Sequence, residues 1–200
     1  MKNERDVLEN LKEKIRSLVR MDDNDLEAIV NQFECRKIAK NDFLLKEGDR
    51  CDFWGFVHTG LVRSYTYTDT GEEYTNGCIR ENGFITESLS FFAQSKSLVN
   101  VVALEDTQLV YVNYIKLQKL YEGFPVFEKF ARILYEERLA GMKAGILYRV
   151  QLDAKSRYLH FVKTQPELMK RVPLKYIASY LNITDSTLSR IRRKTLHSQP

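Results

Sequence analysis

The chain has 200 residues and a net charge of +4, and its 44% hydrophobic and 29% charged residues are ordinary for a soluble globular protein. Nine glycines and four prolines exclude collagen-like and low-complexity chains. No apolar run reaches the roughly 20 residues that cross a bilayer, and the N-terminus is too charged for a secretory signal. We therefore expect a cytoplasmic protein of one large or two small domains that contacts no membrane.

Cysteine and histidine residues are few and isolated. The three cysteines, at Cys35, Cys51 and Cys78, match neither a disulfide framework nor a CxxC metal site. The three histidines have no partner at i+3 or i+4 that would make a metal ligand pair: His58, His160 and His197. Glycine-rich phosphate loops and the HExxH and GxSxG motifs are also missing from the sequence. We predict no metal site, no cofactor, no catalytic residue and no enzymatic activity.

Two helices and then a series of strands are predicted for the first 113 residues. Apolar residues at helical spacing cover 7–19, and a second helical run at 26–33 follows an acidic N-terminus. From residue 35 onwards, short aromatic and β-branched runs alternate with turn residues. The expected strands occupy residues 43–45, 53–58, 61–68, 72–79, 99–104 and 107–112. This pattern favours an antiparallel sandwich, jelly roll or barrel.

Helical spacing returns after the strands. A short helix is expected at 114–121, and Pro125 suits the first turn of a longer helix that runs to about Arg149. The apolar residues of the long helix cover more than one face, which favours a second copy of the helix as its partner. Gly141 and Gly145 would allow two backbones to approach closely. The alternative is a plain core helix that each glycine weakens by about 1 kcal/mol.

Residues 172–194 contain the most informative pattern, after a further helix that is expected to follow Asp153. The first short helix of this segment has one apolar stripe, formed by Leu174, Ile177, Ala178 and Leu181. Asn182 suits the tight connector because asparagine tolerates left-handed dihedral angles. Thr184 is expected to cap a second helix, which Leu188 and Ile191 anchor inward. This spacing is typical of a helix-turn-helix whose second helix enters the major groove of DNA.

Basic residues concentrate around this segment. Residues 163–194 contain eight basic and two acidic residues, a net +6, so the rest of the chain sums to −2. Short polar side chains suit base edges and phosphates, and arginines suit guanine or phosphate. The candidate DNA-binding residues are Lys175, Thr184, Ser186, Thr187, Ser189, Arg190 and Arg193. The alternative is a pair of amphipathic helices with a solvated basic face.

Several segments carry the pattern of a known family. They are DFLLKEGD at 42–49, FWGFVHTGLVRSY at 53–65, ALED at 103–106 and LNITDSTLSRIRRK at 181–194. Together they resemble the bacterial transcription regulators of the CRP/FNR superfamily, and the resemblance covers nearly all of the chain.

The resemblance implies an α+β fold with three parts. These are an N-terminal double-stranded β-helix (jelly-roll) sensor domain over 1–124, a long dimerisation helix over 125–150 and a C-terminal winged-helix/helix-turn-helix domain over 151–200. It further implies a homodimer that binds double-stranded DNA at a roughly two-fold operator, with RNA polymerase as a partner.

The ligand cassette of the cyclic-nucleotide-binding members is altered here. In those members a Gly-Glu pair and a later Arg hold the ribose and the cyclic phosphate. Glu87 matches, Thr86 replaces the Gly, and no arginine lies between Arg80 and Arg132. Lys96 would offer a point charge without the two-pronged fork of arginine. We therefore expect an orphan sensor domain that does not bind cyclic AMP, with a structural role for Glu87. The alternative is a sensing module in which a cyclic nucleotide or another anion controls DNA binding from Glu87, Ser88, Lys96 and Ser97.

Other departures concern the operator, metal centres and the wing. Asp185 and Ser186 stand where cyclic-AMP-type members carry Arg and Glu, so a different operator sequence is expected. The cysteines do not match the four that iron–sulfur sensors need, and His58 is interpreted as a packed or exposed residue rather than a haem ligand. Six residues follow Lys194, so we expect the wing to be short or absent.

Overall fold

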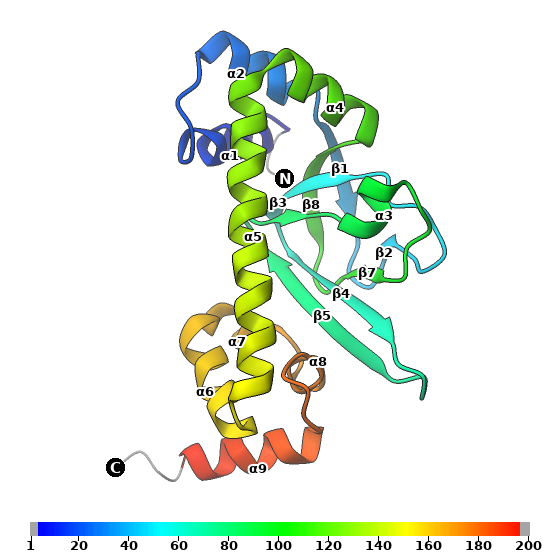
Figure 1. The fold of residues 1–200 in the computed structure, drawn as a ribbon, viewed down its shortest axis with the longest axis vertical. Helices are drawn as coiled ribbons and strands as arrows, with labels where there is room; N and C mark the ends of the chain where they lie inside the picture. Colours follow the sequence, from blue (N-terminus) through cyan, green and yellow to red (C-terminus); the bar gives the residue numbers. More distant parts are fainter. Residues whose placement is uncertain (1–3, 197–200) are drawn as a thin grey trace. The chain divides into compact units, whose positions relative to one another are not determined.

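The computed structural model describes residues 4–196 (Figure 1). His197 therefore lies outside the described residues. The chain divides into two compact units, which we treat separately. The first contains the described residues up to Ser64 together with Ile79–Glu137, and the second contains Tyr65–Cys78 and the described residues from Arg138 onwards. The domain boundaries expected from the sequence stay predictions.

The first unit begins with the two predicted helices, α1 (Glu4–Arg16) and α2 (Asp23–Val30). Helix α1 buries Val7, Leu11 and Ile15 completely, which confirms the apolar face expected from their spacing. Helix α2 starts where the Asp22 carboxylate accepts the N–H of Asn24 at 2.8 Å.

Within the described part of the chain the strands form two sheets of four, with antiparallel pairing of β1 with β8, β2 with β7, and β3 with both β6 and β8. One sheet has the order β1 (Glu34–Ile38), β8 (Thr107–Val112), β3 (Trp54–Thr59), β6 (Phe84–Ile85). The other has the order β2 (Phe43–Leu45), β7 (Asn100–Ala103), β4 (Leu61–Tyr67), β5 (Glu73–Arg80). All six expected strands are present, which confirms a mixed helix and sheet fold with antiparallel sheets.

Three elements of the first 113 residues were not predicted. Strand β1 has the sequence ECRKI and buries only Ile38, so it lacks the apolar run that identifies a strand. Strand β6 is two residues long. Helix α3 (Ser88–Ala93) lies in the strand-rich region and is too short to show helical periodicity.

A glycine is required at the turn between β3 and β4. Gly60 has a φ of +99°, and a Cβ there would collide with the side chain of Thr107 and the carbonyl oxygen of Asp106. Its N–H donates to the Glu81 carboxylate at 2.9 Å, which satisfies the backbone of the turn. This is one of the glycines in the family-like segment 53–65.

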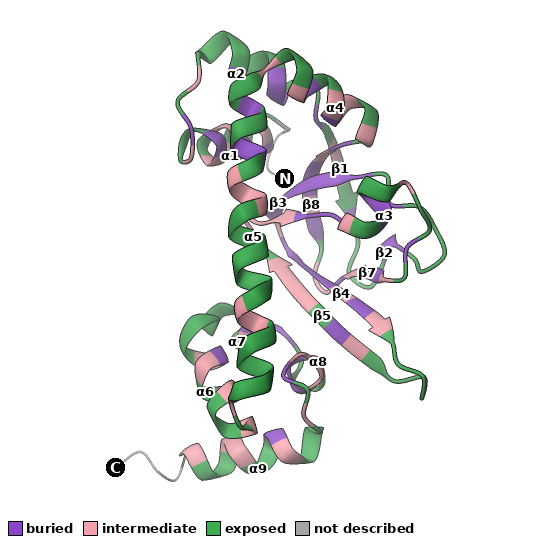
Figure 2. Cartoon of the chain, in the orientation of Figure 1, coloured by how far each residue is buried: buried purple, intermediate pink, exposed green. Residues whose placement is uncertain are grey.

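Aromatic side chains join the sheets of the first unit to the helices that follow them. Helix α4 (Tyr114–Gly123) and helix α5 (Pro125–Gln151) occupy the predicted ranges, with Pro125 as the first residue of α5. Phe127 and Phe130 of α5 are fully buried. The Phe127 ring lies 6.1 Å from Trp54, and the Phe130 ring lies 5.7 Å from Phe84. Beyond this region, most residues of α5 are exposed (Figure 2).

The second unit contains the end of the β4–β5 hairpin, the later part of α5 and four shorter helices. These are α6 (Ala154–Thr164), α7 (Pro166–Arg171), α8 (Leu174–Tyr180) and α9 (Asp185–Leu196). Pro166 occupies the first position of helix α7, which the sequence analysis does not predict. All four helices and their connections contribute buried apolar residues to this unit: Tyr158, Phe161, Leu168, Val172, Ile177, Ala178, Leu181 and Leu188. Among the described residues no strand follows β8, and no helix is long and apolar enough to cross a membrane.

Candidate nucleic-acid interface

The connection between α8 and α9 is a tight turn of defined geometry. Asn182 has a φ of +54°, as predicted from the tolerance of asparagine for this region. Its N–H donates to the carbonyl of Ser179 at 3.0 Å, and the N–H of Ile183 donates to the carbonyl of Ala178 at 3.0 Å. This bond pair is a Schellman motif, which ends α8 and redirects the chain.

The predicted cap of α9 is confirmed. The Thr184 hydroxyl accepts the N–H of Thr187 at 3.2 Å, and the carbonyl of Thr184 accepts the N–H of Leu188 at 3.0 Å. The Thr184 hydroxyl also donates to Thr187 Oγ1 at 2.9 Å and lies 3.0 Å from Ser186 Oγ. The hydroxyls of three candidate contact residues therefore form one cluster at the start of α9.

The two helices pack through three of the four residues expected in the apolar stripe, because Leu174 is exposed at 38% at the start of α8. Ile177, Ala178 and Leu181 of the first helix and Leu188 of α9 are all buried. Ile191, which was also expected to anchor α9 inward, is only half-buried. It instead forms part of the wall of a surface depression described below.

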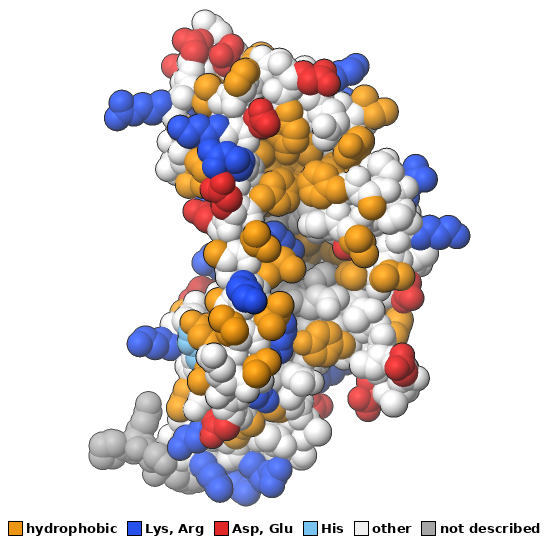
Figure 3. Space-filling model, viewed as in Figure 1, with side chains coloured by type: hydrophobic (Ala, Val, Ile, Leu, Met, Phe, Trp, Pro, Cys, Tyr) orange, Lys and Arg blue, Asp and Glu red, His pale blue; other side chains and the backbone are white. Residues whose placement is uncertain are grey.

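The polar residues predicted to contact DNA lie on the outer side of this helix pair. Ser186, Ser189, Arg190 and Arg193 are exposed on α9, while Thr187 is half-buried. Arg190 Nη2 donates to Thr187 Oγ1 at 3.2 Å, so the guanidinium is held beside the helix. Lys175 is exposed on α8, with its Nζ 4.8 Å from the ring centre of Tyr176. Figure 3 shows Lys and Arg side chains gathered over α9.

Arg157 of α6 holds the turn in place, and the sequence analysis did not identify it. Its Nε donates to the carbonyl of Leu181 at 3.0 Å, and its Nη1 donates to the carbonyl of Leu152 at 2.7 Å. A longer contact of 3.5 Å joins Nη2 to the carbonyl of Asn182. One side chain thus connects the start of α6 to the end of α8.

Ser179 of α8 binds an edge strand. Its hydroxyl donates to the carbonyl of Glu73 and accepts the N–H of Thr75, both at 2.8 Å. Strand β5 is last in its sheet, so the Ser179 hydroxyl binds backbone groups at a sheet edge. Nearby, Arg149 Nη1 donates to the hydroxyl of Tyr74 at 3.2 Å. No sequence pattern indicated the contact between Ser179 and Glu73, which lie about 100 positions apart.

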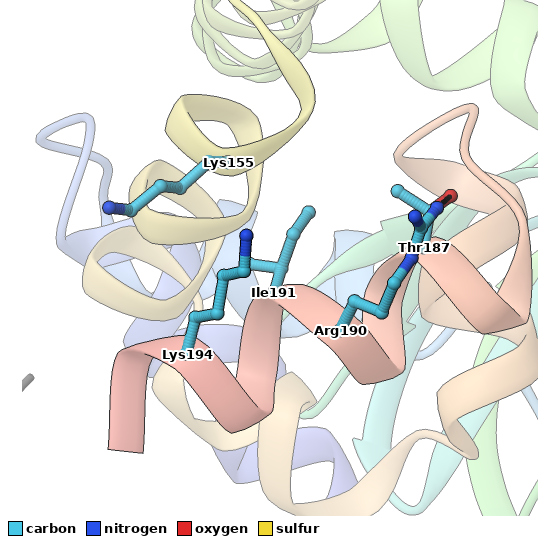
Figure 4. Close-up of a pocket in the computed structure, with 5 residues that line it drawn as sticks. All are labelled: Lys155, Thr187, Arg190, Ile191 and Lys194. Carbon is cyan, nitrogen blue, oxygen red and sulfur yellow. Dashed lines mark hydrogen bonds between the residues drawn. The ribbon is translucent and has the colours of Figure 1, made fainter. Parts of the chain in front are cut away.

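A depression of about 170 Å³ lies between α6 and α9 (Figure 4). Lys155 of α6 lines it together with Thr187, Arg190, Ile191 and Lys194 of α9. Lys155 and Lys194 were not among the predicted contact residues. At the start of α6, the Asp153 carboxylate accepts the N–H of Ser156 at 2.8 Å, which lowers the pKa of that carboxyl and confirms its role as a cap.

The predicted ligand residues of the first unit are engaged in other bonds. Both carboxylate oxygens of Glu87 accept N–H groups of α3, from Leu89 at 3.2 Å and Ser90 at 2.7 Å. The Ser97 hydroxyl donates to the carbonyl of Val99 at 2.8 Å and accepts the N–H of Val99 at 3.0 Å. The remaining two candidates are Ser88, which is half-buried, and Lys96, which is exposed.

The structure describes all three cysteines and two of the histidines, and Cys51 is in hydrogen-bond contact with the backbone of Glu87. Cys51 is buried and Cys35 and Cys78 are half-buried, and these three cysteines form no disulfide with one another. Burial raises the pKa of the Cys51 thiol. His58 is buried, and His160 lies with its ring 4.4 Å from that of Tyr148. No group of three or more potential metal ligands exists among residues 4–196.

Residues 35–123 match the family model described as "Cyclic nucleotide-binding domain". A search of curated protein sequences gave no significant match. Several solved structures share the fold. The c-di-GMP responsive global regulator CLP of Xanthomonas campestris is 20% identical with a TM-score of 0.67, over 88% of this chain and 92% of that chain.

FixK2 of Bradyrhizobium japonicum is 21% identical with a TM-score of 0.68, over 84% of this chain and 85% of that chain. A putative CRP/FNR-family transcriptional regulator of Eubacterium rectale is 16% identical with a TM-score of 0.67, over 87% and 83% of the two chains. The CLP and Eubacterium rectale structures are described as regulators. The domain match and the shared fold confirm the resemblance to CRP/FNR regulators that the sequence carries.

Proposed function

We propose that this protein is a homodimeric, sequence-specific DNA-binding transcription regulator of the CRP/FNR type. The observation that carries the proposal is the pair α8 and α9, with its Schellman turn, its Thr184 cap and its exposed arginines. Its second helix has the length and polarity to enter a major groove. Ser186, Ser189, Arg190 and Arg193 face outward, where base edges would lie.

The second half of α5 supports a homodimer. Its apolar side chains are exposed in the single chain, at 69% for Leu139, 59% for Met142 and 49% for Ile146. Their spacing of three and four residues is that of a coiled-coil seam. A Cβ added at Gly145 would meet nothing within 4 Å, so the surface next to this seam is open in one chain. A second α5 helix is the occupant that would remove this apolar surface from water.

We propose that the sensor domain does not bind cyclic AMP. The Glu87 carboxylate, which would have to take a ribose hydroxyl, already accepts two N–H groups of its own helix. No arginine of the segment 81–131 is available for the cyclic phosphate. Isothermal titration calorimetry with cyclic AMP and cyclic GMP tests this, and we expect no heat of binding at micromolar concentrations. Micromolar affinity for either nucleotide would support the alternative, a sensing module controlled by a cyclic nucleotide or another anion.

Finer features of the fold, the binding partners and the cellular location belong to the same proposal. The two antiparallel sheets are assigned to a double-stranded β-helix sensor, and the last helices to a winged-helix/helix-turn-helix domain. An RNA polymerase contact, a small-molecule effector and a cytoplasmic location follow from the same family likeness.

Arg190→Ala tests the proposed function. On DNA sites selected from a random pool by the unaltered protein, this variant should lose about 1–3 kcal/mol of binding free energy and discriminate less between bases at one position. The control is Lys163→Ala, which removes the same charge from an exposed position on α6 and should keep the base preference. Unchanged affinity and unchanged base preference in Arg190→Ala would contradict the proposal.

A further inference from the structure

We propose that the depression between α6 and α9 seats a phosphate group of the DNA backbone, with Lys155 and Lys194 as its cationic ligands. This inference rests on the proposed function and adds a binding site to it. Of the five residues that line the depression, three carry positive charges, on Lys155, Arg190 and Lys194. Thr187 contributes a hydroxyl and Ile191 an apolar wall.

The position of the depression on α9 favours a phosphate over a base edge. Residues 187, 190, 191 and 194 follow one another at helical spacing and so share one side of α9 (Figure 4). The outward side of the helix is centred on other residues, Ser186, Ser189 and Arg193, which are all exposed. The depression therefore lies on a flank of α9, and Arg190 stands near both surfaces.

The dimensions of the major groove assign this flank to the DNA backbone. A helix with its side chains is about 10–12 Å across, and the major groove is about 12 Å wide. A helix that fills the groove presents its outward side to the base edges, and its flanks come next to the phosphates. Lys155 and Lys194 on this flank consequently face the phosphates of the DNA strand that borders the major groove.

Because Lys155 belongs to α6, a phosphate bound in the depression would also position α9 on the DNA. Lys155 is exposed two residues after the Asp153 cap, on a helix that packs against α9. A phosphate held between the two helices would fix how far α9 enters the groove, because phosphate contacts set the register of a protein on the duplex. Lysine acts there as a point charge without base preference, while Arg190, beside Thr187, is the residue that would read a base edge.

The salt dependence of DNA binding tests whether the depression binds a phosphate. The affinity of the unaltered protein and of Lys155→Ala is measured on a selected DNA site and on a scrambled duplex, from 50 to 200 mM salt. The plot of log K against log salt has a negative slope, and each lost phosphate contact should make that slope less steep by about 0.9 per bound chain. The affinity advantage of the unaltered protein should therefore shrink about 3.5-fold per chain over this fourfold salt range. The variant should weaken on both duplexes by the same factor.

Two further variants complete the test. Lys155→Arg keeps the charge and should keep the slope, whereas Lys163→Ala, on the same helix but outside the depression, should behave as the unaltered protein does. A slope for Lys155→Ala equal to that of the unaltered protein overturns the inference, and so does a change in base preference at constant slope. If the unaltered protein enriches no DNA sequence at all, the proposed function fails instead.

Discussion

Replacing Arg157 by methionine should loosen the turn that positions α9. The methionine keeps most of the apolar stem but removes the guanidinium that binds the carbonyls of Leu152 and Leu181 at 2.7 and 3.0 Å. Both carbonyls then depend on water for a hydrogen-bond donor. The contact with Asn182 at 3.5 Å is too long to add much.

The size of the effect follows from these two bonds. A hydrogen bond from a charged donor contributes about 1.5–3 kcal/mol net. Because Arg157 is half-buried, water replaces part of each bond, and the lower end of the range applies. We therefore expect a loss of about 2–3 kcal/mol. A free-energy loss of that size lowers Tm by about 8–24 °C in a unit of 60–100 residues.

Amide hydrogen exchange places the effect in the turn itself. The N–H groups of Asn182 and Ile183, which close the Schellman motif, should exchange about 30–160 times faster in Arg157→Met. Arg157→Lys should rescue little, because one ammonium cannot reach both carbonyls with the geometry of the fork. Lys163→Met serves as the control on an exposed position of α6. Unchanged Tm and unchanged exchange in Arg157→Met would refute the assigned role of this side chain.

Three further predictions concern other contacts. Ser179→Ala leaves the N–H of Thr75 and the carbonyl of Glu73 without their partner and should cost about 1–2 kcal/mol, seen as faster exchange of the Thr75 amide; equal exchange would contradict this. Gly145→Ala should weaken the dimer in sedimentation even though alanine favours the helix by about 1 kcal/mol, and a dimer of equal or greater stability would favour a plain helix. The N–H of Ser156 lowers the pKa of the Asp153 carboxyl in the folded protein. This cap therefore stabilises the protein fully above the unfolded pKa of about 3.9. The stabilisation is lost as the pH falls towards the lower pKa of the folded state. Asp153→Asn should therefore show a flatter acid limb in thermal unfolding between pH 5 and pH 2, and an identical limb would disprove the assignment.

The helix-turn-helix was predictable from sequence because its determinants are local. Asn182 and Thr184 act on backbone groups within a few residues of themselves, so residue type and spacing are enough to identify them. The same holds for Pro125 at the first position of α5.

The residues missed by the sequence analysis act over long separations. Arg157 reaches the turn 24 residues away, and Ser179 reaches β5 across 106 residues. Lys155 lines the depression because α6 packs against α9, which no local pattern encodes. Short elements such as α3 and α7, each six residues long, give too few positions for a period to show.

Glu87 illustrates a different difficulty. Its position in the sequence matches the glutamate of a ligand cassette, but both of its carboxylate oxygens accept N–H groups at the start of α3. Residue type alone does not distinguish a ligand contact from a helix cap, since both use the carboxylate as a hydrogen-bond acceptor.

Selection of DNA from a random pool by the full chain tests the central claim most directly. A dimer that presents two copies of α9 should enrich a two-fold symmetric sequence whose half-sites lie about one helical turn, roughly 34 Å, apart. Enrichment should disappear or lose base preference when Arg190 is replaced by alanine. Recovery of no sequence above background, or of a single site without two-fold symmetry, would contradict a dimeric DNA-binding regulator.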